Sequence, residues 1–502
     1  MEPIRALVLN RRARGRAASA LLLALAFAAP LRAAQREGAL APNVLLVYAD
    51  DMRADAFGAA GNPALRTPHI DRLAARGTSF ERAYCMGSPH GAVCVPSRAM
   101  LHTGRAYFRL DLDRFTGAVT LGQALGRAGY RTFATGKWHN GFEPFERSFQ
   151  AAENVLFSGM SDHHLVPVRH FDGRNLSAER TASGHSSDLF ADSAARFIAT
   201  CERDQPYFCY LAFTAPHDPR DAPQPYAHRH YADLPPLPPN FLPQQPWDIG
   251  MLTVRDEVLA PWPRPPAVIR QQLAEYYALI EHMDAALGRV LAAVAARDDG
   301  RATVIVFAAD NGLALGSHGL LGKQSVFEHS LAVPLIVVAP GVPAGSTCNA
   351  LVSLCDLYPT LLELTGAVGD REGLFGESLV PLARGTAAGS RDALLLAIGD
   401  TQRAVTDGRY KLIVYPRIDR KRLFDLASDP YERIDLAARP EHAARIAALT
   451  ERLTALQREV GDDAPLSVPD PAPAEVDLSG HPRTPDRWQP RWIREKYFGE
   501  AR

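Results

Sequence analysis

The sequence has little cysteine, almost no net charge and only one long apolar run. Six cysteines in 502 residues are too few for a disulfide framework of the kind that replaces a core in small secreted domains. A formal net charge of −1 gives no basic surface for nucleic-acid binding. Beyond the N-terminal run no stretch suits a bilayer span, and there is no internal repeat. The length suits one large domain or two unequal ones.

The first 33 residues have the layout of a secretory signal peptide. A basic region around Arg11 and Arg12 precedes an apolar run over 17–31, and small residues follow from Ala33. The run is short for a bilayer span, which favours a cleaved signal over a membrane anchor, and twin-arginine export is open. Cleavage after Ala33 removes six arginines and Glu2 and leaves a net charge of −6. We expect an exported protein, periplasmic or extracellular, with no membrane span and no nucleic-acid partner.

Short apolar runs alternate with helical patterns along the chain. Helices are expected after the N-cap residues Thr67 and Thr120 and over residues 268–296. Buried strands are expected at 44–49, 131–135, 207–213, 303–308 and 335–339. This alternation predicts an α/β fold with a large, mostly parallel sheet sandwiched by helices.

Two segments depart from this alternation. Residues 216–266 hold fourteen prolines, which excludes an ordinary helix or central strand. This segment is either an ordered loop that lines the mouth of a site or a flexible insertion, and the sequence leaves both interpretations open. From residue 391, two strands around Asp407-Gly408 and a helix over 440–459 predict a smaller C-terminal α+β domain with an antiparallel sheet. The expected boundaries are therefore 34–390 and 391–502.

Oxygen donors follow two of the predicted strands. Asp50 and Asp51 come after the first, and Asp310 and Asn311 come after the fourth. Sites in open α/β sheets form at the carboxyl ends of strands, so these four side chains are expected to meet. Hard oxygen donors without His or Cys favour Ca²⁺ or Mg²⁺ over Zn²⁺. The alternative is that the paired acids cap turns or helices.

A cysteine motif and three polar motifs complete the candidate site. In CVPSRAMLHTGR, Pro96 favours a first helical turn behind Cys94, and Arg98 lies on that turn. An ordinary buried thiol and a structural salt bridge are the alternatives. Three further motifs supply cations and histidines, namely GKWH with Lys137 and His139, APHDP with His217, and LGSHGLLGKQS with Lys323.

The motif around Cys94 resembles the modification signature of the sulfatase family. Six segments follow the order of that family across residues 43–340, namely DD, CVPSR, GKWH, APH, DNG and GLLGK. The sequence around Cys94 and Lys323 is similar to that of secreted bacterial carbohydrate sulfatases. The resemblance implies that a maturation enzyme oxidises Cys94 to formylglycine, whose hydrated aldehyde is the nucleophile. Val95 departs from the smaller or polar residue of many members.

The same resemblance assigns roles to individual positions. It implies Ca²⁺, with Mg²⁺ as the second choice, bound by the residues Asp50, Asp51, Asp310, Asn311 and the formylglycine from Cys94. The residues that match catalytic or sulfate-binding positions are Arg98, Lys137, His139, His217 and Lys323. For the sulfate pocket, Ser158 and Ser161 are further candidates.

We therefore expect a calcium-dependent sulfatase that acts on a sulfated carbohydrate. A phosphonate monoester or phosphodiester hydrolase of the same superfamily and a non-catalytic sulfated-glycan binder are the alternatives. The segment MSDHHLVPVRH offers Asp162 and His163, with His164 and Arg169, for sugar recognition, as does Arg255. Modification of Cys94 leaves five cysteines. Cys201 with Cys209, or Cys348 with Cys355, are the candidate disulfide pairs. The alternative for Cys209 is that it is simply buried.

Overall fold

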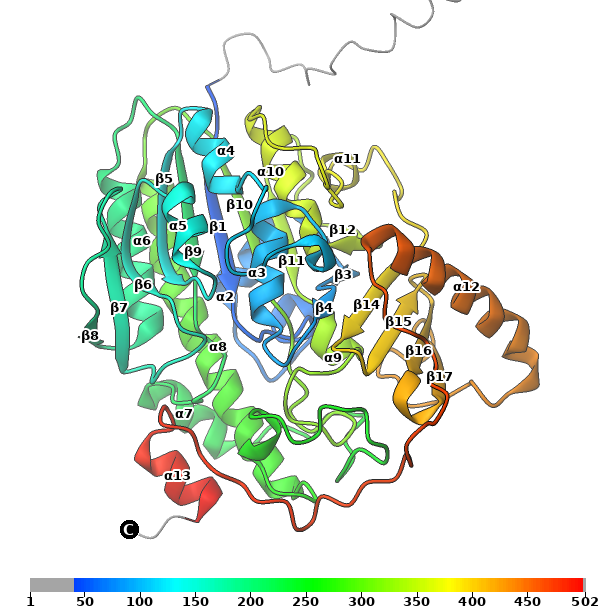
Figure 1. Ribbon diagram of the computed structural model, residues 1–502. Helices are drawn as coiled ribbons and strands as arrows, with labels where there is room; N and C mark the ends of the chain where they lie inside the picture. Colours follow the sequence, from blue (N-terminus) through cyan, green and yellow to red (C-terminus); the bar gives the residue numbers. More distant parts are fainter. Residues whose placement is uncertain (1–39, 500–502) are drawn as a thin grey trace, which may run out of the picture. The chain divides into compact units, whose positions relative to one another are not determined.

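A mixed ten-stranded β-sheet forms the centre of the computed structural model, which describes residues 40–499 (Figure 1). The sheet has the order β12-β2-β11-β10-β1-β9-β5-β6-β7-β8. Its strands are β1 (Asn43–Ala49), β2 (Thr78–Phe80), β5 (Arg131–Lys137), β6 (Ala151–Leu156), β7 (Leu165–Phe171), β8 (Arg180–Ser183), β9 (Tyr207–Ala212), β10 (Thr303–Ala309), β11 (Leu335–Val338) and β12 (Ser346–Cys348). The predicted signal peptide lies outside the described residues.

The centre of the sheet is parallel and its flanks are largely antiparallel. Strands β6, β5, β9, β1 and β10 are mutually parallel, with Val44 opposite Val304 and Phe208. Strand β11 runs antiparallel to β10, and β7 runs antiparallel to β6. All five predicted apolar runs are strands of this sheet. Because β1, β5, β9 and β10 point the same way, the residues that follow them come together at one edge.

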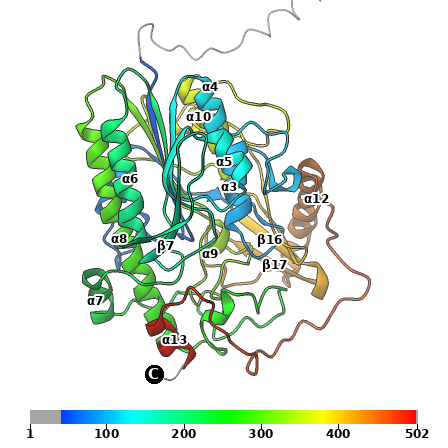
Figure 2. The ribbon, with the colours of Figure 1, turned by 60° about the vertical axis from the view of Figure 1, so that its left-hand side comes forward.

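Helices cover both faces of the sheet, which confirms the predicted α/β class. One face carries α2 (Pro68–Arg76), α6 (Ser186–Thr200) and α8 (Pro266–Ala296). Figure 2 shows α6 and α8 lying side by side along this face. The other face carries α3 (Cys94–Thr103), α4 (Leu121–Arg127), α5 (Phe142–Ser148) and α10 (Leu357–Thr365). As predicted, Thr120 caps α4, its Oγ1 accepting the Gln123 N–H at 3.1 Å. In the described residues no helix is both long and apolar enough to span a membrane.

A second sheet of five strands follows in the C-terminal part. It contains β14 (Leu394–Ile398), β15 (Gln402–Thr406), β16 (Tyr410–Tyr415), β17 (Arg420–Asp425) and β4 (Gly87–Ser88). The predicted hairpin is β15–β16, and the helix expected near residue 440 is α12 (Ala443–Val460). Strand β4 comes from the segment just before Cys94 and pairs parallel with β14. The C-terminal sheet therefore buttresses the segment that carries Cys94.

Several smaller strands and helices lie between these elements. They are β3 (Ala83–Tyr84), which pairs with β13 (Val352–Ser353), and the short helices α9 (Glu328–Leu331) and α11 (Val380–Ala383). All six cysteines lie in the described part of the chain and all are free, with Cys209 buried in β9. Neither candidate disulfide pair is joined, and the burial of Cys209 explains its apolar surroundings.

The proline-rich segment contains a helix, so the prediction that it would hold none was wrong. Helix α7 covers Gln224–Ala232, and Pro225 lies in its first turn, where a backbone N–H has no intrahelical partner to lose. Beyond α12 the chain runs across the molecule to α13 (Arg491–Phe498), which lies beside α7 (Figure 1). The C-terminal tail thus ends against the proline-rich segment rather than on the C-terminal sheet.

Candidate active site

The carboxyl ends of β1, β5 and β10 bring acidic and basic side chains together. Asp50 and Asp51 follow β1, Lys137 ends β5, and Asp310 and Asn311 follow β10. Lys137 Nζ lies 2.5 Å from Asp50 Oδ2, and the Asp51 N–H donates to Asp310 Oδ1 at 3.0 Å. The Asn311 amide donates to Asp51 Oδ1 at 2.8 Å. The strand order therefore joins side chains that are far apart in the sequence.

Cys94 begins α3 beside this cluster and is buried. Its Sγ atom lies 3.0 Å from His139 Nδ1 and 3.6 Å from Lys137 Nζ. Burial raises the pKa of the Cys94 thiol to about 11, although Lys137 acts in the opposite direction. The thiol is therefore protonated near neutral pH and is a poor nucleophile as it stands, unlike the low-pKa thiols of cysteine-dependent enzymes.

Arg98 ties the Cys94 helix to the end of β5, to the middle of β9 and to the residue that follows β10. Its guanidinium donates to the Lys137 carbonyl at 2.7 Å, to the Tyr210 hydroxyl at 3.1 Å and to Asp310 Oδ2 at 2.8 Å. The side chain is completely buried. Arg98 thus fixes where α3 and Cys94 lie relative to the carboxylates, a role for which the planar, five-donor guanidinium is suited.

The backbone around the cluster is held in unusual conformations. Asp51 and His139 have φ values of 65° and 62°, in the left-handed region that only a few per cent of non-glycine residues adopt. Gly159 approaches His139 so closely that a Cβ at that position would lie 2.5 Å from His139 Nε2. Burial, followed by Lys137, lowers the pKa of His139 well below its usual range, so its imidazole is neutral.

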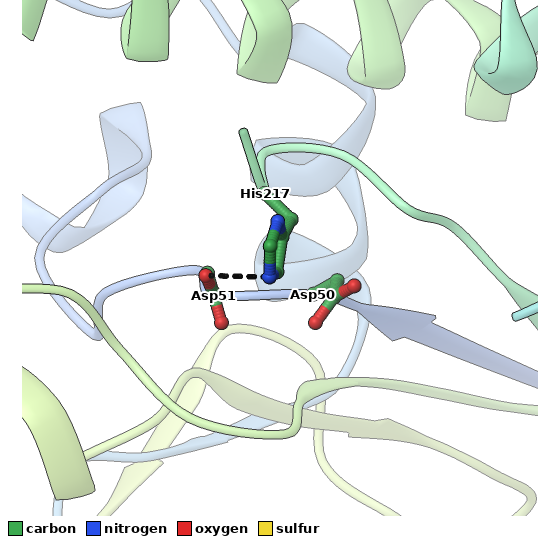
Figure 3. Close-up of side chains that lie close together, drawn as sticks. All are labelled: Asp50, Asp51 and His217. Atoms are coloured by element: carbon green, nitrogen blue, oxygen red, sulfur yellow. Dashed lines mark ion pairs between the residues drawn. The ribbon is translucent and has the colours of Figure 1, made fainter. Parts of the chain in front are cut away.

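His217 and Lys323 contact the cluster at the Asp51 carboxylate. Lys323 Nζ lies 2.7 Å from Asp51 Oδ1, and His217 Nε2 lies 3.6 Å from Asp51 Oδ2. Figure 3 shows the imidazole of His217 directed at the Asp51 carboxylate, with Asp50 beside it. Burial and Lys323 lower the pKa of His217. Burial also acts against the charge of Lys323, but Asp51 leads the interactions that raise its pKa, so the ammonium stays protonated.

The acidic cluster fits a divalent cation. Ligand atoms of Asp50, Cys94 and Asp310 lie within 4.8 Å of one another. Among the described side chains, Asp50 Oδ1 and Asn311 Oδ1 are buried and have no hydrogen-bond partner. Burial, reinforced by Asp310, raises the pKa of Asp50, and a bound cation would relieve both effects. The oxygen donors suit a hard ion such as Ca²⁺ or Mg²⁺.

Two of the residues expected to recognise sugar, Asp162 and His163, make contacts within the protein. His163 is buried, with Nδ1 2.6 Å from Ser186 Oγ and Nε2 3.0 Å from the His217 carbonyl oxygen. Asp162 Oδ1 accepts the N–H of His164 at 2.7 Å. His163 therefore lies where it supports the His217 loop, and Asp162 shapes its own loop.

The serine candidates differ in their surroundings. Ser158 donates to the Met160 carbonyl at 3.1 Å on the surface. Ser161 is buried, and its hydroxyl has no partner among the described residues. The loop that carries both serines runs past His139 at Gly159, and of the two only Ser161 has a buried hydroxyl without a described partner.

Sequence reasoning missed several residues that hold the site in place. Tyr276 donates to the Asp51 carbonyl at 2.8 Å and accepts the Arg53 N–H at 2.9 Å, which fixes the turn after β1. Asp218 and Asp256 lie beside His217 and Lys323. Asp218 follows His217 directly in the APHDP motif, and this position could have identified it as a site residue. No local sequence pattern distinguishes Tyr276 within its long helix.

Comparison with protein families places the chain among enzymes of one class. The family model described as "Sulfatase" matches residues 42–367, which include every residue of the cluster. The chain belongs to the sulfatase family. A second model, described as "N-sulphoglucosamine sulphohydrolase, C-terminal", matches residues 316–459. This sulfatase is therefore a sulfuric ester hydrolase, as predicted, and the expected family resemblance is confirmed.

Relatives and solved structures agree with this assignment. The sulfatase is 26% identical to an ulvan-active sulfatase of Formosa agariphila, over 86% of this chain and 83% of the relative. It is also 26% identical to an N-acetylglucosamine-6-O-sulfatase of Bacteroides thetaiotaomicron, over 86% and 89% of the two chains.

Two solved structures share its fold. One is a protein in complex with its substrate D-glucosamine-2-N,6-O-disulfate (TM-score 0.72, 22% identity, 85% of this chain and 99% of the other). The second is the phosphonate monoester hydrolase of Agrobacterium radiobacter (TM-score 0.66, 24% identity, 84% and 96%). At these identities the likeness concerns the fold alone.

Proposed function

We propose that this sulfatase hydrolyses a sulfate ester on a carbohydrate, with a formylglycine made from Cys94 and with bound Ca²⁺. The observation that carries the proposal is the position of Cys94 at the start of α3, between His139 and Lys137 and against the carboxylate cluster. The names of the relatives, which act on ulvan or on sulfated N-acetylglucosamine, support a carbohydrate substrate.

Five positions would hold the metal ion. They are Asp50, Asp51, Asp310, Asn311 and the group at position 94. When bound, the cation supplies positive charge next to the sulfate oxygens and to the group that attacks sulfur. The family resemblance favours Ca²⁺, and the donor set alone admits Mg²⁺ as well.

The residues around position 94 would prepare the nucleophile. The Sγ atom of Cys94 stands in for an oxygen of the hydrated aldehyde, which supplies a hydroxyl group for attack on sulfur. His139 Nδ1 lies within hydrogen-bond distance of that atom and is neutral, so it can accept a proton there. Lys137 Nζ stabilises negative charge at the same position, and Arg98 holds the Lys137 carbonyl in place.

The leaving oxygen would lie on the side of His217 and Lys323. Lys323 carries its proton at neutral pH and supplies positive charge for the departing oxygen. The Nδ1 atom of His217 lies 2.7 Å from the Asp218 carbonyl oxygen, which accepts an N–H from it and thereby directs Nε2 toward the cluster. We propose that the Lys323 ammonium gives a proton to the leaving oxygen as the sulfur–oxygen bond breaks, while neutral His217 presents its unprotonated Nε2 atom on the same side of the cluster.

Sulfate release from sulfated monosaccharides tests the proposal. The native protein with Ca²⁺ should release sulfate, and Cys94→Ala should release none above background. Parallel assays with matched aryl sulfate and aryl phosphonate esters address the rival activity that the fold also supports. Faster phosphonate than sulfate hydrolysis would contradict the proposal.

Export is a further part of the proposal. It rests on the signal-peptide layout of residues 1–33, which lie outside the described part of the chain. An exported protein would meet polymeric or oligomeric sulfated glycans outside the cytoplasm.

A further inference from the structure

The C-terminal tail, residues 461–499, lies beyond both family matches and yet reaches the candidate active site. Its last helix is anchored on α8, where the Glu275 carboxylate accepts from Lys496 Nζ at 2.9 Å and from the Tyr497 hydroxyl at 2.6 Å. The Lys496 ammonium also lies 4.6 Å from the ring centroid of Tyr231 in α7. The segment just before α13 is thereby held against the proline-rich segment.

That segment contributes Asp486 and Gln489 to a charged cluster, here called the rim cluster, together with Asp218, Arg255 and Asp256. Arg255 Nη1 donates to Asp218 Oδ1 at 2.6 Å and to Asp256 Oδ1 at 3.1 Å. Its Nη2 and Nε donate to Asp486 Oδ2 at 2.5 and 2.8 Å. Gln489 donates to Asp218 Oδ2 at 2.7 Å. Every nitrogen of the Arg255 guanidinium is therefore engaged by a carboxylate.

The rim cluster lies directly beside the two residues assigned to the leaving oxygen. Asp218 follows His217 in the chain, and its backbone carbonyl oxygen accepts the N–H of the His217 ring. Asp256 Oδ2 lies 4.0 Å from Lys323 Nζ. Within the cluster, Arg255 and Asp486 keep 30% and 25% of their side-chain surface exposed, whereas Asp218 keeps 4%. The solvent-accessible part of the rim cluster is thus the Arg255–Asp486 pair.

The charge of the rim cluster decides what it can accept. Three carboxylates surround one guanidinium, and Lys323 is already paired with Asp51. Burial opposes ionisation of Asp218 and Asp256, but Arg255 lowers the pKa of Asp218, and Lys323 and Arg255 lower the pKa of Asp256, so both are ionised. The cluster therefore has no spare positive charge for a second anion. Its carboxylate oxygens are acceptors for hydroxyl and amide N–H groups.

We propose that the rim cluster recognises the sugar ring next to the scissile sulfate and selects a hexose that carries one sulfate over the same ring with a second sulfate. This inference rests on the proposed function, because the sugar carbon must adjoin the leaving oxygen. Asp486 is the specificity-determining residue of the cluster. It comes from a tail that neither family model covers, so the selection belongs to this chain rather than to the shared fold.

Calorimetric binding to the full-length Cys94→Ala protein with Ca²⁺ tests the inference without turnover. The probes are N-acetylglucosamine 6-sulfate and D-glucosamine-2-N,6-O-disulfate, which differ at one ring substituent. We expect the monosulfate to bind at least about tenfold more tightly, since a like charge at the rim is unfavourable. Asp486→Asn should reduce this preference to about threefold or less, and Asp486→Glu, which keeps the charge, should retain it.

Asp470→Asn is the matched control, because Asp470 is exposed on the same tail and lies outside the rim cluster. It should leave the preference unchanged. Failure of both sugars to bind, equal or tighter binding of the disulfate, or equal effects of Asp486→Asn and Asp470→Asn would overturn the inference. The proposed function fails separately, if the protein with Cys94 intact and with Ca²⁺ releases no sulfate from a panel of sulfated monosaccharides.

Discussion

The Nδ1 atom of His139 lies 3.0 Å from the Sγ atom of Cys94, although 45 positions separate the two residues in the chain. His139 adopts a φ of 62°, so its ring reaches Cys94 only because the backbone turns sharply after β5. Strained backbone of this kind persists where the surrounding structure fixes it, and it is frequent at functional sites.

His139→Asn should lower kcat by about 10²- to 10⁴-fold with a small change in KM, because Asn accommodates the left-handed backbone but cannot accept the proton. His318→Asn is the control, since His318 is also a buried histidine with positive φ, at 54°, and its ring stacks on Phe327. Steady-state kinetics on an aryl sulfate make the comparison. Equal losses in the two variants would show that His139 acts only through folding.

Calcium should stabilise the folded protein through the carboxylate cluster. At a free Ca²⁺ concentration of about 100 times Kd, binding adds about 2.7 kcal/mol to the free energy of unfolding, and chelation removes it. Asp50→Asn should abolish most of this gain, because Asp50 is buried at the centre of the cluster. Thermal melts with and without chelator measure the effect, with the exposed Asp470→Asn as control. A calcium shift that survives in Asp50→Asn would place the ion elsewhere.

Arg98→Lys should destabilise the fold by about 3–5 kcal/mol, since it leaves a buried carboxylate short of its partner. A lysine cannot replace the contacts to the Lys137 carbonyl, the Tyr210 hydroxyl and Asp310 together. Arg289→Lys, at a side chain that is 45% exposed and paired with Asp188, should cost no more than about 1 kcal/mol. Denaturant unfolding compares the two, and similar losses would contradict this role of Arg98.

His102 should make the protein less stable in acid. Its ring is buried with centroid distances of 4.8 Å to both Trp138 and Tyr210, and burial, followed by Arg98, lowers its pKa to about 3. In the unfolded chain the pKa of His102 is near 6.5, the ordinary value for histidine, so between pH 3 and pH 6.5 the unfolded state binds the extra proton. The contribution of His102 to the free energy of unfolding is therefore complete above pH 6.5, and it is lost as the pH falls toward 3.

At pH 5 this loss amounts to about 2 kcal/mol. His102→Phe keeps an aromatic ring and should remove this part of the pH dependence of stability. The difference in free energy of unfolding between variant and parent should therefore change by about 2 kcal/mol from pH 7.5 to pH 5. His228→Phe, at an exposed position of α7, is the control for the replacement of a histidine by phenylalanine. A pH-independent difference for His102→Phe would contradict the assignment.

The sequence predicted the centre of the fold better than its edges. Runs such as 303–308 are continuously apolar because β10 is buried on both faces, and such runs are recognisable without a structure. Strands β7 and β8 were missed because their exposure is mixed and β7 contains Pro167, which is tolerated at this flank of the sheet. The helix α7 was missed because four of the segment's prolines cluster around it, one of them inside its first turn.

In the candidate site, too, some residues could be predicted from the sequence and others could not. The motifs around Asp50, Cys94 and Lys323 are local, so residue order was enough to nominate them. The contact of Arg255 with Asp486 joins positions 231 residues apart, and only the three-dimensional course of the tail reveals it. His163 was nominated for sugar contact by its polar neighbours, whereas its two ring nitrogens lie against Ser186 and the His217 carbonyl.

The mass of the peptide that contains Cys94, from protein purified out of its own host, tests the central claim most directly. We predict that position 94 carries an aldehyde or its hydrate, as the high pKa of the buried thiol and its place beside His139 and Lys137 suggest. An unmodified cysteine in protein that hydrolyses sulfate esters would contradict the account.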